Sequence, residues 1–224
     1  MNIDIINPHV MKILISARDK DSISSISSRI GLSYGWTHKW VKKLVSEGIF
    51  KEKWRGLELQ KNNTTYKSIL EFIKNNFNNA QFYYSVLNLF GIDYCLTKTD
   101  AVYFWTEGRY NIARYRDYYP VFVKINKKDY NLFLNYCKKL GLNINKKKGI
   151  FYSPKIIDIK NKNIKCSEKE ELRVETLKDT IRFMKDNIYN FQPALEMIQE
   201  KYGKKLNINY SEANFYGKSS KQGK

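Results

Sequence analysis

The chain has 224 residues, a mass of 26.6 kDa and a formal net charge of +18, because 40 Lys and Arg stand against 22 Asp and Glu. Hydrophobic residues make up 42% and aromatic residues 15%, which excludes a disordered polymer and allows one large or two small domains with a buried core. This basic balance favours a polyanionic partner such as DNA, RNA or an anionic membrane surface. An AT-rich coding sequence would also raise the Lys content, but it does not explain the shortage of acids.

Several further classes are excluded by features that the sequence lacks. No run of roughly 18 apolar residues is present, so no transmembrane helix is expected. The first residues have neither the basic nor the apolar region of a secretory signal. The cysteines, Cys95, Cys137 and Cys166, form no CxxC pair, and His9 and His38 are the only histidines. We therefore expect a cytoplasmic protein with no metal site, no cofactor, no disulfide framework and no His-based triad.

The first 62 residues have the periodicity of three helices followed by a β-hairpin. Asn7 and Pro8 are typical of a helix start, Ser22 of a second N-cap, and Gly31 of a left-handed helix end. After Gly48 the hydrophobic period changes from helical to alternating, which predicts strands. The expected elements are helices beginning near residues 8, 22 and 34 and strands over 49–54 and 57–59, joined by a turn at Arg55-Gly56.

Three short motifs in this part resemble the winged helix-turn-helix transcription regulators. They are Gly31-Leu32-Ser33, then Thr37-x-x-x-Val41-x-x-Leu44, then Glu47-Gly48-Ile49-Phe50. The resemblance covers residues 7–59. It implies that residues 34–47 form the recognition helix, which lies in the DNA major groove, and that residues 49–59 form the wing, which contacts the adjacent backbone or minor groove.

The third helix provides the main candidate DNA-binding residues. With Thr37, Val41, Leu44 and Val45 directed inward as the family pattern requires, a helical wheel places the opposite residues on the outer face. Lys and His can donate hydrogen bonds to guanine, and Lys can also bind a DNA phosphate. Gly permits close approach of the helix to the DNA, and the helix N-terminus capped by Ser33 can lie near a phosphate. A plain solvated basic face is the alternative. The candidate residues are Ser33, Gly35, Trp36, His38, Lys39, Lys42 and Lys43.

The hairpin provides a second group of candidates, Lys51, Lys53 and Arg55. Cations on a wing can contact phosphates, although Lys on an edge strand also prevents aggregation. Trp40 and Trp54 are expected in the core or in an interface rather than stacked on bases.

Residues 63–210 predict a mixed α/β domain that ends in helices, so the whole chain is expected to be α+β. A polar stretch at residues 62–64 marks the expected boundary between domains 1–62 and 63–210. Residues 211–224 form a basic tail that is expected to be disordered. The expected helices cover residues 64–77, 80–90, 127–140 and 168–202, and the expected strands cover 92–96, 121–125, 149–152 and 155–159. The helical stretch 168–202 is expected to be interrupted near 191–193, with Pro193 at the start of the final helix. Residues 100–105 could form either a helix or a strand.

Within this second part, Arg and Tyr alternate between residues 109 and 119. Arg109, Arg114, Tyr115 and Arg116 form a candidate second basic surface. Arg with aromatic residues binds phosphates and stacks on bases, and the same residues serve as anchors in protein interfaces. Nucleic-acid binding, protein binding and a structural loop all remain open.

The whole chain also resembles the abortive-infection (AbiE-type) antitoxins, in which a winged helix precedes a domain sometimes related to nucleotidyltransferases. The residues concerned are Tyr94-Cys95-Leu96-Thr97-x-x-Asp100-Ala101 and Glu175-Thr176-Leu177-x-Asp179. A working nucleotidyltransferase needs a Gly-Ser turn and then paired carboxylates on one strand for Mg²⁺, and the sequence has no Gly-Ser followed by an Asp-x-Asp. We expect no enzyme.

The sequence therefore predicts a transcription regulator that binds double-stranded DNA, most readily as a homodimer reading two half-sites. The second domain would dimerise, bind a partner or sense a ligand. The second hypothesis is an antitoxin or protein-interaction module that binds a toxin partner. The third is a nucleotidyl-transferring enzyme.

Overall fold

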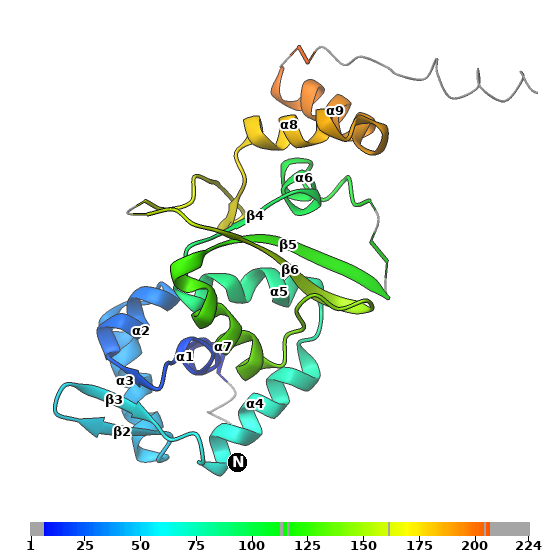
Figure 1. Ribbon diagram of the computed structural model, residues 1–224. Coiled ribbons are helices and arrows are strands. Elements are labelled where there is room, and N and C mark those ends of the chain that lie inside the picture. The colour runs from blue at the N-terminus through cyan, green and yellow to red at the C-terminus, as the bar shows by residue number, and fades with distance from the viewer. Residues whose placement is uncertain (1–6, 113, 116, 161, 204, 207–224) are drawn as a thin grey trace, which may run out of the picture. The chain divides into compact units, whose positions relative to one another are not determined.

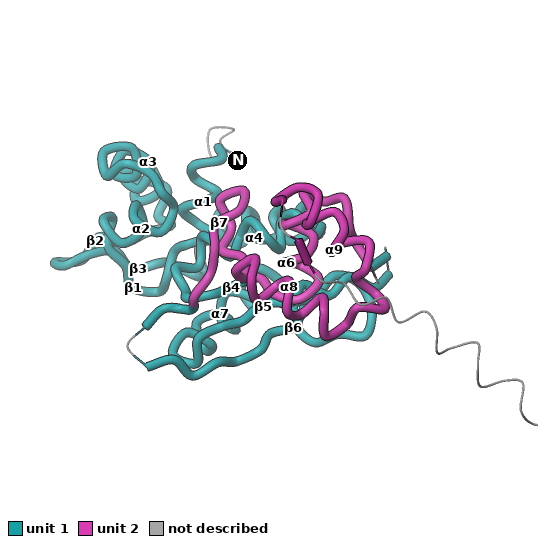
Figure 2. The backbone as a smooth tube through the Cα atoms, turned by 90° about the horizontal axis from the view of Figure 1, so that it is seen from above, with its two compact units in different colours: residues 1–95, 114–164 teal, residues 96–113, 165–224 magenta. Residues whose placement is uncertain are grey.

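The computed structural model describes residues 7–112, 114–115, 117–160, 162–203 and 205–206 (Figure 1). Helices and strands are mixed throughout, as predicted. The chain divides into two compact units, residues 1–95 with 114–164 and residues 96–113 with 165–224 (Figure 2). The division does not coincide with the predicted boundary at residues 62–63, because unit 1 joins the first 62 residues to much of the later chain.

No described helix is both long and apolar enough to span a bilayer. The predicted tail, residues 211–224, lies outside the described residues.

Unit 1 begins with three helices that pack on one another, α1 (Pro8–Ser16), α2 (Ile23–Ile30) and α3 (Tyr34–Ser46). Each begins at a side chain that accepts a hydrogen bond from a free backbone N–H of the first turn, and these caps are Asn7, Ser22 and Ser33. Gly31 ends α2 with a φ of 66°, as predicted.

A three-stranded antiparallel sheet follows, with the strand order β1-β3-β2. It consists of β1 (Lys20–Asp21), β2 (Phe50–Lys53) and β3 (Gly56–Leu59). Strand β1 was not predicted, since two residues carry no periodicity. Gly56 is needed where β3 passes β1, because a Cβ there would lie 2.3 Å from the carbonyl oxygen of Asp21. The hairpin turn consists of Trp54 and Arg55, one residue earlier than predicted.

The rest of unit 1 combines helices with a parallel strand pair. Strands β5 and β6 pair in parallel through nine residues each, joined by α7, and β4 lies next to β5 in the strand order. The prediction of two strands around Ser153-Pro154 is wrong. Strand β6 is continuous and tolerates Pro154 because it is an edge strand. The elements are α4 (Thr64–Asn76), α5 (Ala80–Leu87), η2 (Asn88–Phe90), β4 (Tyr94–Leu96), β5 (Tyr118–Asn126), η3 (Lys127–Asp129), α7 (Tyr130–Leu140) and β6 (Gly149–Ile157).

Unit 2 corrects the prediction of helix from residue 168 onward. A short antiparallel hairpin occupies residues 167–174, and its turn residues Glu170 and Glu171 have φ values of 50° and 64°. The break between the last two helices falls at Asn187, so Pro193 lies inside α9 rather than at its start. The elements are α6 (Thr99–Trp105), β7 (Ser167–Lys169), β8 (Leu172–Val174), α8 (Leu177–Asp186) and α9 (Ile188–Tyr202).

The largest fully buried side chains of unit 1 are aromatic. The rings of Tyr83 and Tyr152 have centroids 4.9 Å apart, and Phe133 lies 5.2 Å from Tyr152. The Tyr152 hydroxyl donates to the carbonyl of Tyr83, and the Tyr83 hydroxyl accepts from the backbone N–H of Asn143 at 3.0 Å. Buried tyrosine hydroxyls are thus satisfied, which holds α5 against β6.

Candidate nucleic-acid interface

Helix α3 has one buried and one exposed face, and the division follows the predicted pattern closely. Thr37, Val41 and Leu44 are buried, and Val45, also predicted inward, is half-buried. On the opposite face the predicted candidates divide into two groups. Gly35, Trp36, Lys39 and Lys42 are exposed, whereas His38 and Lys43 are half-buried.

The start of α3 is fixed by local hydrogen bonds. The Ser33 hydroxyl accepts from the backbone N–H of Trp36 at 3.4 Å, and the Thr37 hydroxyl donates to the Ser33 carbonyl at 3.0 Å. Ser33 itself is exposed. The predicted cap is therefore present, and it leaves an accessible helix N-terminus of the kind that attracts anions.

The exposed face of α3 is aromatic as well as basic. The Lys39 ammonium lies 5.2 Å from the Trp36 ring centroid, and Tyr34 stacks on His38 at 5.9 Å. Trp36 is 53% and Tyr34 55% exposed. Tyr34 was not among the predicted candidates, and its only signal in the sequence is an aromatic residue at an outward position. These contacts hold flat rings and a cation together on one exposed surface.

The hairpin carries an exposed tryptophan at its turn. Trp54 is 95% exposed, which excludes the core, one of its two predicted environments, while Trp40 is half-buried on α3. The reason is positional: Trp54 is a turn residue between β2 and β3, where no second layer of described structure covers the side chain. The predicted candidates Lys51, Lys53 and Arg55 are also exposed.

Two of the candidate lysines are already paired with carboxylates. Nζ of Lys42 lies 2.7 Å from Glu52, and Nζ of Lys53 lies 3.2 Å from Glu58. Within the described part of the chain, Lys39, Lys51 and Arg55 have no carboxylate partner. Exposed ion pairs contribute about 0–1 kcal/mol to the free energy of folding. A polyanion can therefore replace Glu52 and Glu58 as the partners of these lysines at small energetic cost. Helix α3 and the hairpin together carry six Lys or Arg against two Glu.

The residues of the candidate second basic surface belong to both units. Arg109 is exposed in unit 2, whereas Arg114 and Tyr115 belong to unit 1. Arg114 is half-buried, donates to the Tyr84 hydroxyl at 3.3 Å and stacks on Tyr119 at 4.9 Å. Tyr115 is 64% exposed, and Arg116 lies outside the described residues. The contacts of Arg114 join β5 to α5, which favours a structural role for this residue.

Asp93 and Asp100, which lie beside or within the motif that resembles the AbiE-type antitoxins, serve the fold or are buried. The Asp93 side chain accepts from the backbone N–H of Ile164 at 2.9 Å and from the Asn126 amide at 3.2 Å. Asp100 is fully buried in α6 of unit 2. Among the residues that the structure describes, no group of three or more His, Cys, Asp or Glu is arranged to hold a metal ion.

Comparison of the chain with models of protein families, with curated proteins and with solved structures gives no match. Its class is therefore inferred from its own residues and geometry.

Proposed function

We propose that the protein is a transcription regulator of the winged helix-turn-helix kind that binds double-stranded DNA. Helix α3 would enter the major groove and the β2–β3 hairpin would contact the adjacent backbone or minor groove. The observation that carries this proposal is the joint surface of α3 and the hairpin, which pack together. This surface exposes Lys39 over the Trp36 ring, and it exposes Lys53 and Arg55 on either side of Trp54 in the chain. Three packed helices with a small three-stranded sheet support the same proposal.

The shape of α3 suits a groove about 12 Å wide. Space beside Gly35 is open, because outside its own helix no atom lies within 4 Å of the position that a Cβ would take. Lys39 and Lys42 project from the same exposed face. Their ammonium groups donate to guanine or phosphate oxygens, and the hairpin cations add contacts to the backbone that fix the register but do not read sequence. One helix in one groove gives modest specificity, so we propose a homodimer on two half-sites.

A protein partner is the second candidate function, in line with the antitoxin alternative. Tyr189 on α9 is 85% exposed, and exposed tyrosines are enriched in interfaces. A toxin partner bound through this residue would co-purify with the wild-type protein and be lost from Tyr189→Ala, while DNA binding stayed unchanged.

DNA binding is tested by selection from random and genomic fragments, followed by affinity measurements over a salt series. We expect selected fragments to bind at least about 10³-fold more tightly than the background, with log affinity falling linearly with log salt. Weak, equal binding to all sequences would overturn the proposal.

Two substitutions and a control locate the contact surface. Lys39→Ala and Trp54→Ala should each weaken binding by about tenfold, or roughly 1.4 kcal/mol, without loss of thermal stability, since both side chains are exposed. Lys155→Ala removes an equally exposed cation from β6 and should leave affinity unchanged. Equal losses in all three variants would indicate a general charge effect instead of this surface.

A further inference from the structure

Unit 1 contains a cavity of about 870 Å³ on the side of α1 where the chain leaves the helix. Its walls come from the segment between α1 and β1, the segment between β3 and α4, and the helices α4 and α7. The volume falls within the range of small-molecule sites, roughly 300–1,000 Å³. A DNA duplex is too wide to enter such a cavity, whereas a small molecule fits its volume.

Among the described residues, the cavity is lined by seven cationic side chains and by a single carboxylate. Helix α4 contributes Lys67 and Lys74, and α7 contributes Lys138 and Lys139. The two connecting segments contribute Arg18 and Lys61, and strand β1 contributes Lys20. The carboxylate, Asp19, is already bound by Lys61 at 2.7 Å. So many like charges around one cavity repel one another, and a bound anion would relieve that repulsion.

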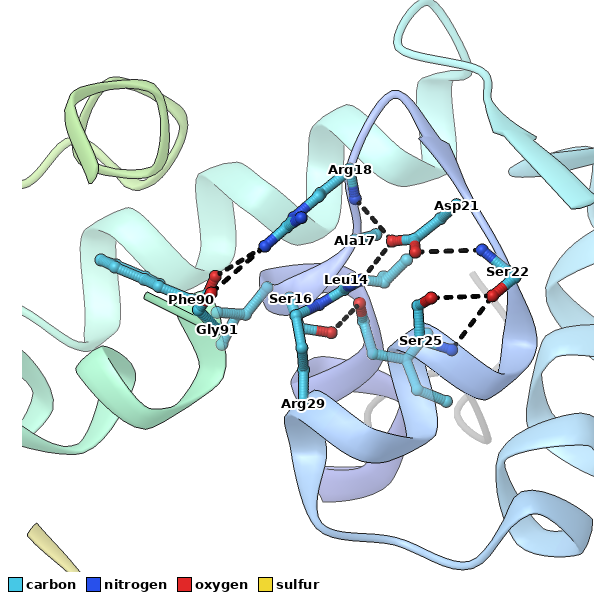
Figure 3. Close-up of polar contacts among 12 residues, drawn as sticks. Leu14, Ser16, Ala17, Arg18, Asp21, Ser22, Ser25, Arg29, Phe90 and Gly91 are labelled. Carbon is cyan, nitrogen blue, oxygen red and sulfur yellow. Dashed lines mark hydrogen bonds and ion pairs between the residues drawn. The ribbon is translucent and has the colours of Figure 1, made fainter. Parts of the chain in front are cut away.

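Two of these cations are held in place by backbone carbonyls. The Lys139 ammonium donates to the carbonyls of Leu14, Ile15 and Ala17 at 2.6, 3.1 and 2.8 Å. Arg18 donates to the carbonyls of Phe90 and Gly91 at 3.3 and 3.4 Å (Figure 3). Their positions are therefore set by the fold. Lys67 and Lys138, in contrast, are exposed and have no carboxylate partner among the described residues, so they are free to close on an anion.

The remaining walls are apolar or aromatic. Leu70 of α4 and Leu132 of α7 line the cavity together with Leu59 at the end of β3. Tyr66 and Tyr136 add ring surface, and burial raises the pKa of both hydroxyls, which therefore stay protonated. The cavity thus combines cations for an anionic group with a surface for a flat or apolar group.

We infer that this cavity binds a small organic phosphate of the nucleotide type. Its phosphates would lie between Lys67, Lys138 and Lys20, and its ring system would lie against Leu70, Leu132 and Tyr66. Such a ligand would contact β1, the end of β3, α4 and α7 at once. The inference does not depend on DNA binding, since it rests on a different set of residues.

Calorimetric titration of the full chain, without DNA, tests the inference with ATP, pyrophosphate and adenosine as probes. We expect ATP to bind most tightly, pyrophosphate more weakly because it lacks the ring, and adenosine weakly or not at all because it lacks the charge. The thermal midpoint should rise with ATP concentration. No heat and no shift in midpoint with either phosphate probe at millimolar concentration would overturn the inference.

Matched variants distinguish this cavity from general attraction to a basic protein. Lys67→Gln/Lys138→Gln removes two exposed cations at the cavity and should weaken ATP binding at least about tenfold, since a charged hydrogen bond contributes about 1.5–3 kcal/mol. Lys155→Gln/Lys160→Gln removes two exposed cations elsewhere and should leave ATP affinity unchanged. Equal affinity in the two double variants would exclude the cavity as the binding site.

Discussion

Arg29 of α2 and Asp21 of β1 form an ion pair that is nearly removed from solvent, with 9% and 3% of their side-chain surfaces exposed (Figure 3). Asp21 also accepts from the backbone N–H groups of Arg18 and Ser22, each at 3.0 Å. One carboxylate therefore joins the segment after α1 to the helix that precedes the candidate recognition helix. Its partners lie on both sides of β1, so the pair fixes the entry into α2.

Loss of one partner of this pair should be costly. Arg29→Met leaves a buried carboxylate without its counter-charge, so we expect the free energy of unfolding to fall by about 3–5 kcal/mol. Lys61→Met is the matched control, because its pair with Asp19 is exposed and should contribute less than about 1 kcal/mol. Urea unfolding measures both. Similar small losses in the two variants would show that burial of the Arg29 pair does not matter for stability.

Two glycines should respond in opposite ways to substitution by alanine. Gly56→Ala brings a Cβ against the Asp21 carbonyl at β1, so we expect a loss of about 1–3 kcal/mol. Gly35→Ala has open space and lies in a helix, where alanine is favoured by about 0.5–1 kcal/mol. Gly35→Ala should nevertheless weaken DNA binding, because the added carbon lies on the surface proposed to enter the groove. Unchanged DNA affinity in this stable variant would contradict close approach at Gly35.

Glu52 is expected to reduce DNA affinity in the native protein. It pairs with Lys42 at 2.7 Å and adds a negative charge to the proposed DNA surface. Glu52→Gln frees Lys42 and should raise affinity several-fold at low salt, with a steeper salt dependence. Glu71→Gln, which frees Lys74 on α4 instead, is the control and should change DNA affinity little. A fall in affinity with Glu52→Gln would argue against DNA contact by Lys42.

Stability should depend on pH through Lys139. The pKa of its ammonium is lowered to about 7, mainly by burial. The nearby charges of Asp19 and Asp21 oppose this shift, and those of Arg29 and Lys61 add to it. Below about pH 7 the Lys139 ammonium is protonated in both the folded and the unfolded chain, so its contribution to the free energy of unfolding does not change with pH. Above that pH the unfolded chain keeps a proton that the folded chain has released, so the free energy of unfolding rises by up to about 1.4 kcal/mol per pH unit. The rise ends when the lysine of the unfolded chain also loses its proton, near pH 10.4.

The difference in unfolding free energy between the wild type and Lys139→Met isolates this effect. It should grow in favour of the wild type between pH 7 and 9. A difference that stays flat over this range would mean that the ammonium remains charged among its three carbonyl acceptors.

Local features were predictable because local contacts create them. The caps at Ser22 and Ser33 bind backbone groups within three residues, and Gly31 ends α2 through its own φ, so a short window of sequence contains the full cause. The buried stripe of α3 was likewise predicted from its spacing. The β7–β8 hairpin was missed because its strands have three residues each, too few for a clear alternation.

The sequence by itself therefore determined the class of fold, the first helices and the basic outer face of α3. Only the tertiary structure decided the environment of individual side chains. Trp54 and Trp105 are the same residue type, yet the first is 95% and the second 7% exposed. Lys139 is one of many lysines, but only the packing of α7 on the end of α1 gives it three carbonyl acceptors. The burial of Trp105, the exposure of Trp54 and the pairing of Lys139 depend on which distant parts of the chain pack beside them, and residue spacing within one element does not reveal those neighbours.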